Sequence, residues 1–182
     1  MLLLATKKIP THFVKRINDR EQLIKKCEII PIEFVVRNVA SGSICSRLGI
    51  KDGLKLKKPL LEYYLKEDSL DDPIVSRDHL ELFGWATKKE IENIDRMSLK
   101  INHCLINHFK KKGITLVDFK IEFGRLSSNK KKIVLADEIS PDSCRLWDSK
   151  SKTKLDKDVF RKGLGNLIDA YEEVASRLGI VH

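Results

Sequence analysis

The stretch LVDFKIEFG, residues 116–124, alternates apolar and charged side chains along its length. Successive side chains of a strand point to opposite faces, so one face of this strand would be apolar and the other charged. The apolar face would carry Val117, Phe119, Ile121 and Phe123, and the charged face Asp118, Lys120 and Glu122. The alternation predicts a strand with a core face. Its charged face fits either a solvated surface with cross-strand ion pairs or a site that holds a cation and an anion together.

Composition leaves the class of partner open. The chain has 182 residues, 42% of them hydrophobic, which is enough for a core in one domain or in two small lobes that share a cleft. A formal charge of +9 and a pI near 9.4 favour anionic partners: nucleic acid, an anionic membrane or small phosphorylated ligands. The four cysteines form no C-x-x-C pair, so neither a zinc site nor a disulfide framework is indicated, and we expect reduced thiols in a cytosol.

The first ten residues, MLLLATKKIP, contain the strongest candidate for a targeting signal. Their apolar run is too short for a membrane span or for the core of a standard signal peptide. We interpret the stretch as the tail of a helix whose beginning is missing.

The first half of the chain predicts strands with short connections. Residues 12–17 and 27–40 are rich in β-branched and aromatic side chains, and we expect a short helical or turn segment between them. Ser41, Gly42 and Ser43 precede a short amphipathic stretch that ends at Gly49, which predicts a short helix. Its free backbone N–H groups could bind a phosphate.

A change of period marks a long helix in the middle of the chain. A strand is expected at residues 57–66 and an acidic loop at 67–73. Thr87 and Glu90 then form a capping-box pattern, and apolar residues keep helical spacing up to Gly113. The pattern predicts one amphipathic helix that begins after Thr87 and ends near Gly113.

The second half predicts a hairpin and a last helix. Residues 132–140 would pair with the strand at 116–124, and the basic run that ends at Lys132 would be the solvated hairpin loop. Helical spacing returns from Leu167 to Leu178. Because strands and helices mix without a regular βαβ rhythm, we expect an α+β fold or a two-lobed protein of sheet and helices.

Two carboxylates on this hairpin form a candidate metal site. Asp137 ends the second strand, and the hairpin could bring it near Glu122. Two carboxylates with few other ligands suit Mg²⁺, which keeps several waters and takes further ligands from phosphate oxygens. Lys120, on the same face as Glu122, would neutralise phosphate or carboxylate charge that develops in a reaction.

Three arginines are candidate anion ligands. Arg37 leads into NVASGS, Arg145 lies in SPDSCRLWD, and Arg161 follows DKDVF. A guanidinium group suits bidentate binding of phosphate or carboxylate. For each arginine taken alone, a surface salt bridge is the alternative explanation.

Four stretches together resemble a known family. PIEFVVRNVASGS, LVDFKIEFG and VLADEISPDSCRLWD, in this order and followed by LDKDVFR, resemble the signature stretches of the SAICAR synthetases. The resemblance implies a ligase that joins L-aspartate to the carboxylate of carboxyaminoimidazole ribonucleotide while ATP becomes ADP and phosphate, through an acyl phosphate. It also implies a two-lobed α+β fold with a kinase-like and ATP-grasp-like nucleotide cleft, Mg²⁺, a cytoplasmic homodimer, and no nucleic-acid or membrane partner.

Matching the motifs position by position implies roles for ten residues. Glu122 and Asp137 match the Mg²⁺ carboxylates, and Arg37, Ser43 and Arg145 match ligands of the ribonucleotide phosphate. Asp118, Lys120 and Arg161 match residues of the nucleotide-substrate and reaction centre, and Lys66 and Asp72 match a loop near the substrates. The charged face of the strand at 116–124 would then line the nucleotide cleft.

The resemblance also implies a domain division. Residues 1–40 would be the remnant of an N-terminal ATP-binding lobe that lacks its glycine-containing strands, and residues 41–182 would be the substrate-binding lobe. Two other interpretations stay open: a truncated inactive form, or a basic nucleic-acid-binding module. The module would require a contiguous basic surface, whereas the basic residues here are dispersed among 26 acidic ones.

Overall fold

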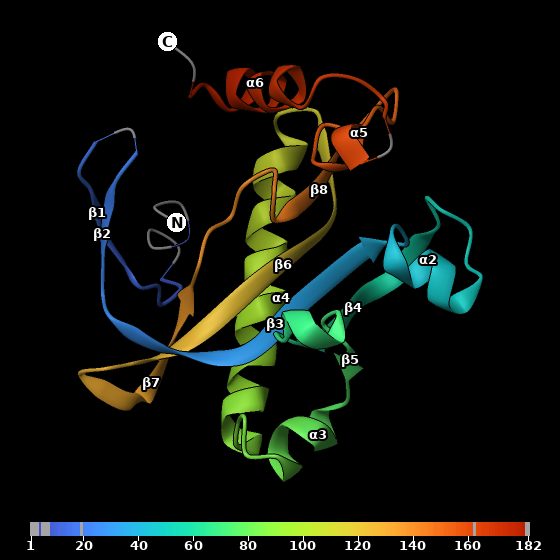
Figure 1. Cartoon of the computed structure of the whole chain (residues 1–182). Coiled ribbons are helices and arrows are strands. Elements are labelled where there is room, and N and C mark those ends of the chain that lie inside the picture. Colours follow the sequence, from blue (N-terminus) through green and yellow to red (C-terminus); the bar gives the residue numbers. More distant parts are fainter. Residues whose placement is uncertain (1–3, 5–7, 19, 162, 181–182) are drawn as a thin grey trace. The chain divides into compact units, whose positions relative to one another are not determined.

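A computed structural model describes residue 4 and residues 8–18, 20–161 and 163–180 (Figure 1). Most of the segment that we interpreted as a helix tail lies outside these residues. The strands are β1 Phe13–Arg16, β2 Gln22–Ile24, β3 Cys27–Val39, β4 Lys55–Leu65, β5 Ile74–Val75, β6 Ile114–Leu126, β7 Asn129–Ala136 and β8 Cys144–Asp148. The helices are α2 Ser43–Leu48, the 3-10 turn η1 Asp68–Leu70, α3 Arg77–Leu82, α4 Lys88–Lys110, α5 Asp158–Arg161 and α6 Leu167–Leu178.

Six strands form one sheet. Their order is β5-β4-β3-β6-β7, and β8 pairs with β6 beside this path, while β1 and β2 form a separate two-stranded sheet. β6 is antiparallel to both β7 and β8. The strands therefore do not follow a repeated βαβ pattern, which confirms the α+β class.

The chain forms two compact units, and each is built from three separated segments. Unit 1 comprises Met1–Val35, Leu61–Ile101 and Ile121–Glu138, and unit 2 comprises Val36–Leu60, Asn102–Lys120 and Ile139–His182. The long elements β3, β4, β6 and α4 each contribute residues to both units. The division into lobes at residue 40 stays a prediction.

Aromatic side chains organise the core of unit 1. Phe34 packs edge-on against Tyr63 and Phe123, with ring centroids 5.7 and 5.3 Å apart. The first half of α4 adds Ile91 and Ile94, both fully buried. Because Phe123 belongs to the apolar face of β6, its burial confirms that this face lies in a core.

The core of unit 2 contains Val39, Val117 and Trp147. α6 lies beside the C-terminal end of α4 (Figure 1). Arg177 of α6 holds this corner, since its Nη1 donates to the Gly113 carbonyl at 3.2 Å and pairs with Asp148 Oδ2 at 2.8 Å. The last helix is thus fixed to the loop that leads into β6.

The predicted ends of the long helix α4 and the predicted end of the short helix α2 are confirmed, whereas the hairpin strand expected at 132–140 is β7 and ends at Ala136. Glu90 Oε2 accepts from the Thr87 backbone N–H at 2.8 Å, and Thr87 Oγ1 accepts from the Glu90 N–H at 3.3 Å, so the capping box is present at the start of α4. Gly113, with φ 69°, follows the end of this helix, and Gly49, with φ 64°, ends α2. Both adopt the left-handed conformation that favours glycine.

Two local expectations were wrong. Part of the segment between the first two predicted strands is itself a strand, β2, paired with β1. The lysines of the basic run lie in β7, not in a loop, because β6 and β7 stay paired up to Leu126 and Asn129. Residues 129–132 are exposed along this strand. Pairing with a neighbour outweighed the turn-like composition of both segments.

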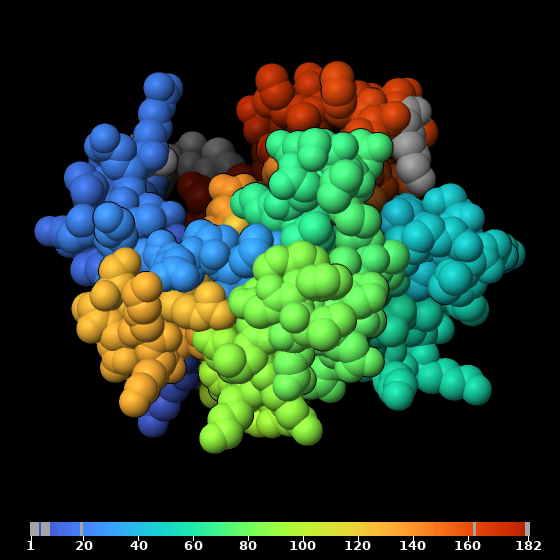
Figure 2. Space-filling model, turned by 60° about the horizontal axis from the view of Figure 1, so that its bottom comes forward, coloured from blue at the N-terminus to red at the C-terminus, as the bar shows by residue number. Residues whose placement is uncertain are grey.

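The surface of unit 1 is apolar where α3 ends. Leu82 and Phe83 are 76% and 60% exposed. Figure 2 shows α3 and the beginning of α4, in green and yellow-green, together on one face of this unit. No described helix is long and apolar enough to cross a membrane.

We expect Glu90 to stabilise the fold through its ion pair with Arg125 as well as through its capping hydrogen bonds. Arg125 of β6 donates to both Glu90 oxygens, with Nε 2.7 Å from Oε1, and this bond is the largest cause that lowers the pKa of Glu90 from 4.5 to about 2. Since the folded-state pKa is depressed, the stabilisation is complete above pH 4.5 and is lost as pH falls towards 2. We expect Glu90→Gln to lower the free energy of unfolding at pH 7 by about 1–3 kcal/mol.

Denaturant titrations from pH 2 to 7 would measure this effect, with Glu92→Gln, an exposed neighbour on α4, as the control. The stability of the Glu90→Gln variant should depend less on pH in the acid range. An acid dependence equal to that of the unmodified chain would contradict the assigned ion pair.

Candidate functional site

A buried carboxylate in unit 2 binds two guanidinium groups. Arg37 Nη1 donates to Asp118 Oδ2 at 2.7 Å, and Arg145 Nη1 donates to the two Asp118 oxygens at 3.2 and 3.1 Å. Arg37 is 2% exposed and Asp118 3%. Arg145 also donates from Nε to Asp158 Oδ2 at 3.0 Å. We call these four residues the arginine cluster.

The register of the strands explains how the arginine cluster forms. Asp118 on β6 is paired with Arg145 on β8, after an irregularity in the pairing between Leu116 and Asp118. Arg37 lies on β3, which is next to β6 in the sheet. Three neighbouring strands therefore each supply one member of the buried ion pairs.

The charges of the arginine cluster depend on one another. Burial raises the pKa of the Asp118 carboxyl, an effect that the positive charges of Arg145 and Arg37 oppose. Burial also acts to lower the pKa of Arg145, but Asp118 and Asp158 outweigh it and raise that pKa. Both guanidinium groups keep donors beyond those used by Asp118, because each has five N–H bonds.

The turn before α2 packs directly on the arginine cluster. Arg37 donates to the Ser41 carbonyl and to Ser43 Oγ, each at 3.2 Å. Gly42 has φ 66°, and a Cβ atom at this position would lie 2.5 Å from Arg145 Nη2. Any side chain at Gly42 would therefore displace Arg145. Ser43 and Arg145 therefore lie next to the same turn. Binding of one anion by both residues would require such an arrangement.

The segment LDKDVFR brings two cationic and two acidic side chains to the same unit. Asp156 accepts from the backbone N–H groups of Leu146 and Asp158 at 2.7 and 2.8 Å, which fixes the turn that carries Lys157. The pKa of Lys157 is lowered, first by burial and then by Arg161, Arg145 and Lys120, against the opposing charge of Asp142. Lys157 therefore lies near enough to Arg161, Arg145 and Lys120 to be influenced by them, with Asp142 as an opposing charge.

The two candidate metal ligands lie on the hairpin of unit 1. Ala136 is paired with Glu122, so Asp137 directly follows the residue opposite Glu122. Asp137 has φ 56°, and β7 ends just before it. Glu122 is 4% exposed and accepts from Lys66 Nζ at 2.7 Å. Among the residues that the structure describes, no group of three or more His, Cys, Asp and Glu could hold a metal.

This donor set fits a magnesium ion that is shared with a ligand. Two carboxylates supply part of an octahedral shell, and water and phosphate oxygens would complete it. Lys66 at present supplies the positive charge next to Glu122. Its side chain is 47% exposed, so its ammonium group can move into solvent when a cation takes its place.

The remaining predicted residues take different positions. Asp72, with φ 45°, accepts from the Glu67 N–H at 2.9 Å and so closes the loop that follows Lys66. Lys120 is partly buried, and its backbone N–H donates to the Ser143 carbonyl at 2.8 Å. Arg161 is exposed at the end of α5.

The structure therefore groups the predicted residues by unit. Arg37, Ser43, Asp118 and Arg145 meet in unit 2, and Lys66 and Glu122 meet in unit 1. Since Asp118 and Glu122 are almost fully buried, a solvated surface does not describe these two members of the charged face of β6. Sequence reasoning missed Asp156, Lys157 and Asp158, although the motif LDKDVFR contained them.

Residues 1–178 match the family model described as SAICAR synthetase. The chain belongs to this family. A relative from Pelagibacter ubique, named phosphoribosylaminoimidazole-succinocarboxamide synthase, is 62% identical over 175 residues, which are 96% of this chain and 67% of the relative. A relative of the same name from Acidiphilium cryptum is 58% identical over 95% of this chain and 68% of its own length.

Solved structures of SAICAR synthetases agree with this fold. The enzyme from Ehrlichia chaffeensis superposes with a TM-score of 0.97 at 50% identity, over 100% of this chain and 77% of that chain. A SAICAR synthetase in complex with ADP gives a TM-score of 0.93 at 45% identity, over 97% of this chain and 75% of that chain. The resemblance seen in the sequence motifs is thus confirmed.

Asp118 is expected to be essential to the stability of unit 2. In Asp118→Asn, two buried or partly buried arginines lose a charged partner, and an unpaired buried charge costs about 3–5 kcal/mol. We expect a loss near the lower end of this range, since Arg145 keeps Asp158. Chemical denaturation would measure it, with Asp142→Asn at an exposed position as the control. Equal stability of the two variants would contradict the role of the ion pairs.

Proposed function

We propose that this chain performs the SAICAR synthetase reaction. It would join the amine of L-aspartate to the carboxylate of carboxyaminoimidazole ribonucleotide, with conversion of ATP to ADP and phosphate. Membership of the family supports this activity, and the observation that carries the assignment to particular residues is the buried pairing of Asp118 with Arg37 and Arg145. The same membership favours a ligase over the nucleic-acid-binding module.

The arginine cluster would bind the phosphate of the ribonucleotide. Asp118 fixes the two guanidinium planes, so both groups are already oriented before a ligand arrives. Ser43 adds a hydroxyl next to Arg37, and Arg161 adds charge from α5. Asp118 acts as a positioning residue here, because both of its oxygens already accept hydrogen bonds from arginine.

Glu122 and Asp137 would hold Mg²⁺ together with the phosphates of ATP. Binding of ADP by a solved relative supports a nucleotide ligand for this chain. When bound, the ion would supply positive charge that neutralises charge on the phosphates. Lys66 would move away from Glu122 when the metal binds. Asp72 would stabilise the loop that begins at Lys66.

The chemistry requires activation of a carboxylate. A carboxylate does not react with an amine, because it carries negative charge and has no good leaving group. Transfer of the γ-phosphoryl group of ATP to the substrate carboxylate would give an acyl phosphate and ADP. The aspartate amine would then attack the acyl carbon, form the amide bond and release phosphate, with loss of a proton from nitrogen. Lys120 would neutralise the oxygen charge that develops during these steps.

We also propose that the protein acts as a homodimer in the cytoplasm, as the family resemblance implies. Sedimentation equilibrium of the purified chain would measure the subunit number. A mass equal to one chain at all concentrations would contradict the dimer.

Product formation tests the proposed reaction. The purified 182-residue chain, incubated with Mg²⁺, ATP, L-aspartate and carboxyaminoimidazole ribonucleotide, is expected to give the succinocarboxamide product, detected by mass spectrometry. Omission of any one component should abolish the product. Absence of product from a chain shown to be folded would contradict activity of this chain and favour an inactive form.

Glu122→Gln tests the metal assignment. The substitution keeps the shape of the side chain but removes its charge, so we expect Mg²⁺-dependent ADP formation to fall on the order of 100-fold or more. Glu28→Gln on β3 is the matched control, because the Glu28 side chain is 53% exposed and pairs at 2.8 Å with the exposed Lys130 and only at 3.9 Å with Arg125. Turnover of Glu122→Gln equal to that of the control would refute the role of Glu122.

A further inference from the structure

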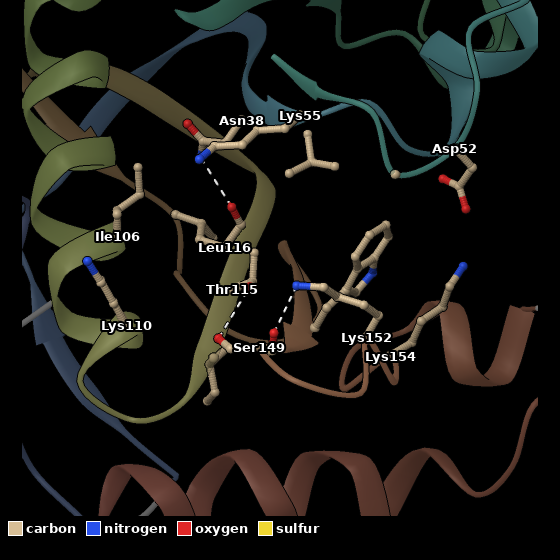
Figure 3. A pocket seen from close by; sticks show the side chains of 14 residues that line it. Asn38, Asp52, Lys55, Ile106, Lys110, Thr115, Leu116, Ser149, Lys152 and Lys154 are labelled. Carbon is tan, nitrogen blue, oxygen red and sulfur yellow. Dashed lines mark hydrogen bonds between the residues drawn. The ribbon is translucent and has the colours of Figure 1, made fainter. Parts of the chain in front are cut away.

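A cavity in unit 2 lies apart from the residues given a role above. It has a volume of about 880 Å³, within the range of about 300–1,000 Å³ found for small-molecule pockets. Its walls come from β3, the start of β4, the end of α4, the start of β6, and β8 with the loop that follows it (Figure 3). No member of the arginine cluster lines it.

The charge of this cavity is strongly positive. Four lysines line it against a single acidic residue, Asp52. They are Lys55 of β4, Lys110 of α4, and Lys152 and Lys154 in the loop after β8, and Figure 3 shows them around the cavity. Cations gathered round one concave surface raise the local concentration of anions.

Most of these lysines have no acidic partner. Lys154 Nζ lies 3.9 Å from Asp158 Oδ2. Lys152 Nζ donates to the Ser149 carbonyl at 2.8 Å. Within the described part of the chain, Lys55, Lys110 and Lys152 form no ion pair. Three ammonium groups are therefore available to an anion that enters the cavity.

The inner wall of the cavity is apolar. Trp147, which is 7% exposed, forms it together with Val39 and Leu116. The hydroxyl groups of Thr115 and Ser149, 3.0 Å apart, add a small polar edge. An apolar wall with an indole ring suits a flat ring system, and lysines at the edge suit a phosphate, which they bind as point charges.

We propose that this cavity is a second anion-binding site, which takes an organic phosphate of mononucleotide size. Its ring would pack on the wall formed by Trp147, Val39 and Leu116, and its phosphate would bind among Lys55, Lys110 and Lys152. The proposal goes beyond the ligase reaction, because none of these residues has a role in it.

The choice of test residues follows from the contacts of Lys154. Its Nζ is 5.8 Å from the centroid of the Trp147 ring as well as 3.9 Å from Asp158, so it touches both the cavity and the arginine cluster. Substitution of Lys154 would therefore disturb both. Lys110 and Lys152 line the cavity and form no ion pair with the arginine cluster among the described residues, and Lys111 and Lys150 are exposed neighbours that do not line the cavity.

The experiment follows the indole N–H signal of Trp147 by NMR while AMP is added. The chain has two tryptophans, so Trp85→Phe identifies the signal. We expect AMP to shift it saturably, and adenosine, which lacks the phosphate, to bind at least tenfold more weakly. The double variant Lys110→Ala/Lys152→Ala should weaken AMP binding at least tenfold, whereas Lys111→Ala/Lys150→Ala should leave it unchanged.

Several results would overturn the proposal. These are a Trp147 signal that AMP does not shift, equal affinity for adenosine and AMP, or equal weakening by the two double variants. Lys110→Gln provides a milder second variant if the double variant does not fold, and it should weaken binding by several-fold. Product formation by the ligase is measured separately, so failure of one proposal is distinguishable from failure of the other.

Discussion

The pairing of Asp118 with Arg37 and Arg145 holds together three strands of the sheet, and the rest of unit 2 is arranged around it. All three side chains lie in or at the edge of a core, where removal of charge from water costs several kcal/mol per ion. That cost is offset only while every member is present and well placed. Gly42, Ser43 and Asp158 are the supports of this arrangement, since each contacts one of the two arginines.

The two buried carboxylates of β6, Asp118 and Glu122, differ in the freedom of their cationic partners. Asp118 pairs with Arg37, which is buried and lies on the neighbouring strand β3. Glu122 binds Lys66, whose side chain is 47% exposed at the end of a strand. Lys66 could therefore give way to the proposed metal ion without loss of a buried contact, whereas Arg37 is fixed in the core. This contrast fits a fixed anion site in unit 2 and an exchangeable cation site in unit 1.

Positive charge in unit 2 is organised in two ways. In the arginine cluster, each guanidinium group forms an ion pair with a carboxylate, which fixes its orientation. Around the cavity, three of the lysines form no ion pair with a carboxylate among the described residues. The first arrangement favours a ligand of defined geometry. The second favours any anion of suitable size, because an ammonium group binds as a point charge.

The sequence by itself determined the elements that depend on neighbouring residues: the alternation of β6, the long helix with its Thr87 and Glu90 cap, and the motifs that identify the family. Periodicity and capping act within a few positions, so they can be read from the chain alone. Only the tertiary structure decided the short strands β2 and β8, the contact of Glu90 with Arg125, and the roles of Asp156 and Lys157. These features depend on pairing between distant segments, such as the 81 positions that separate Arg37 from Asp118, and a local pattern does not encode such a partner.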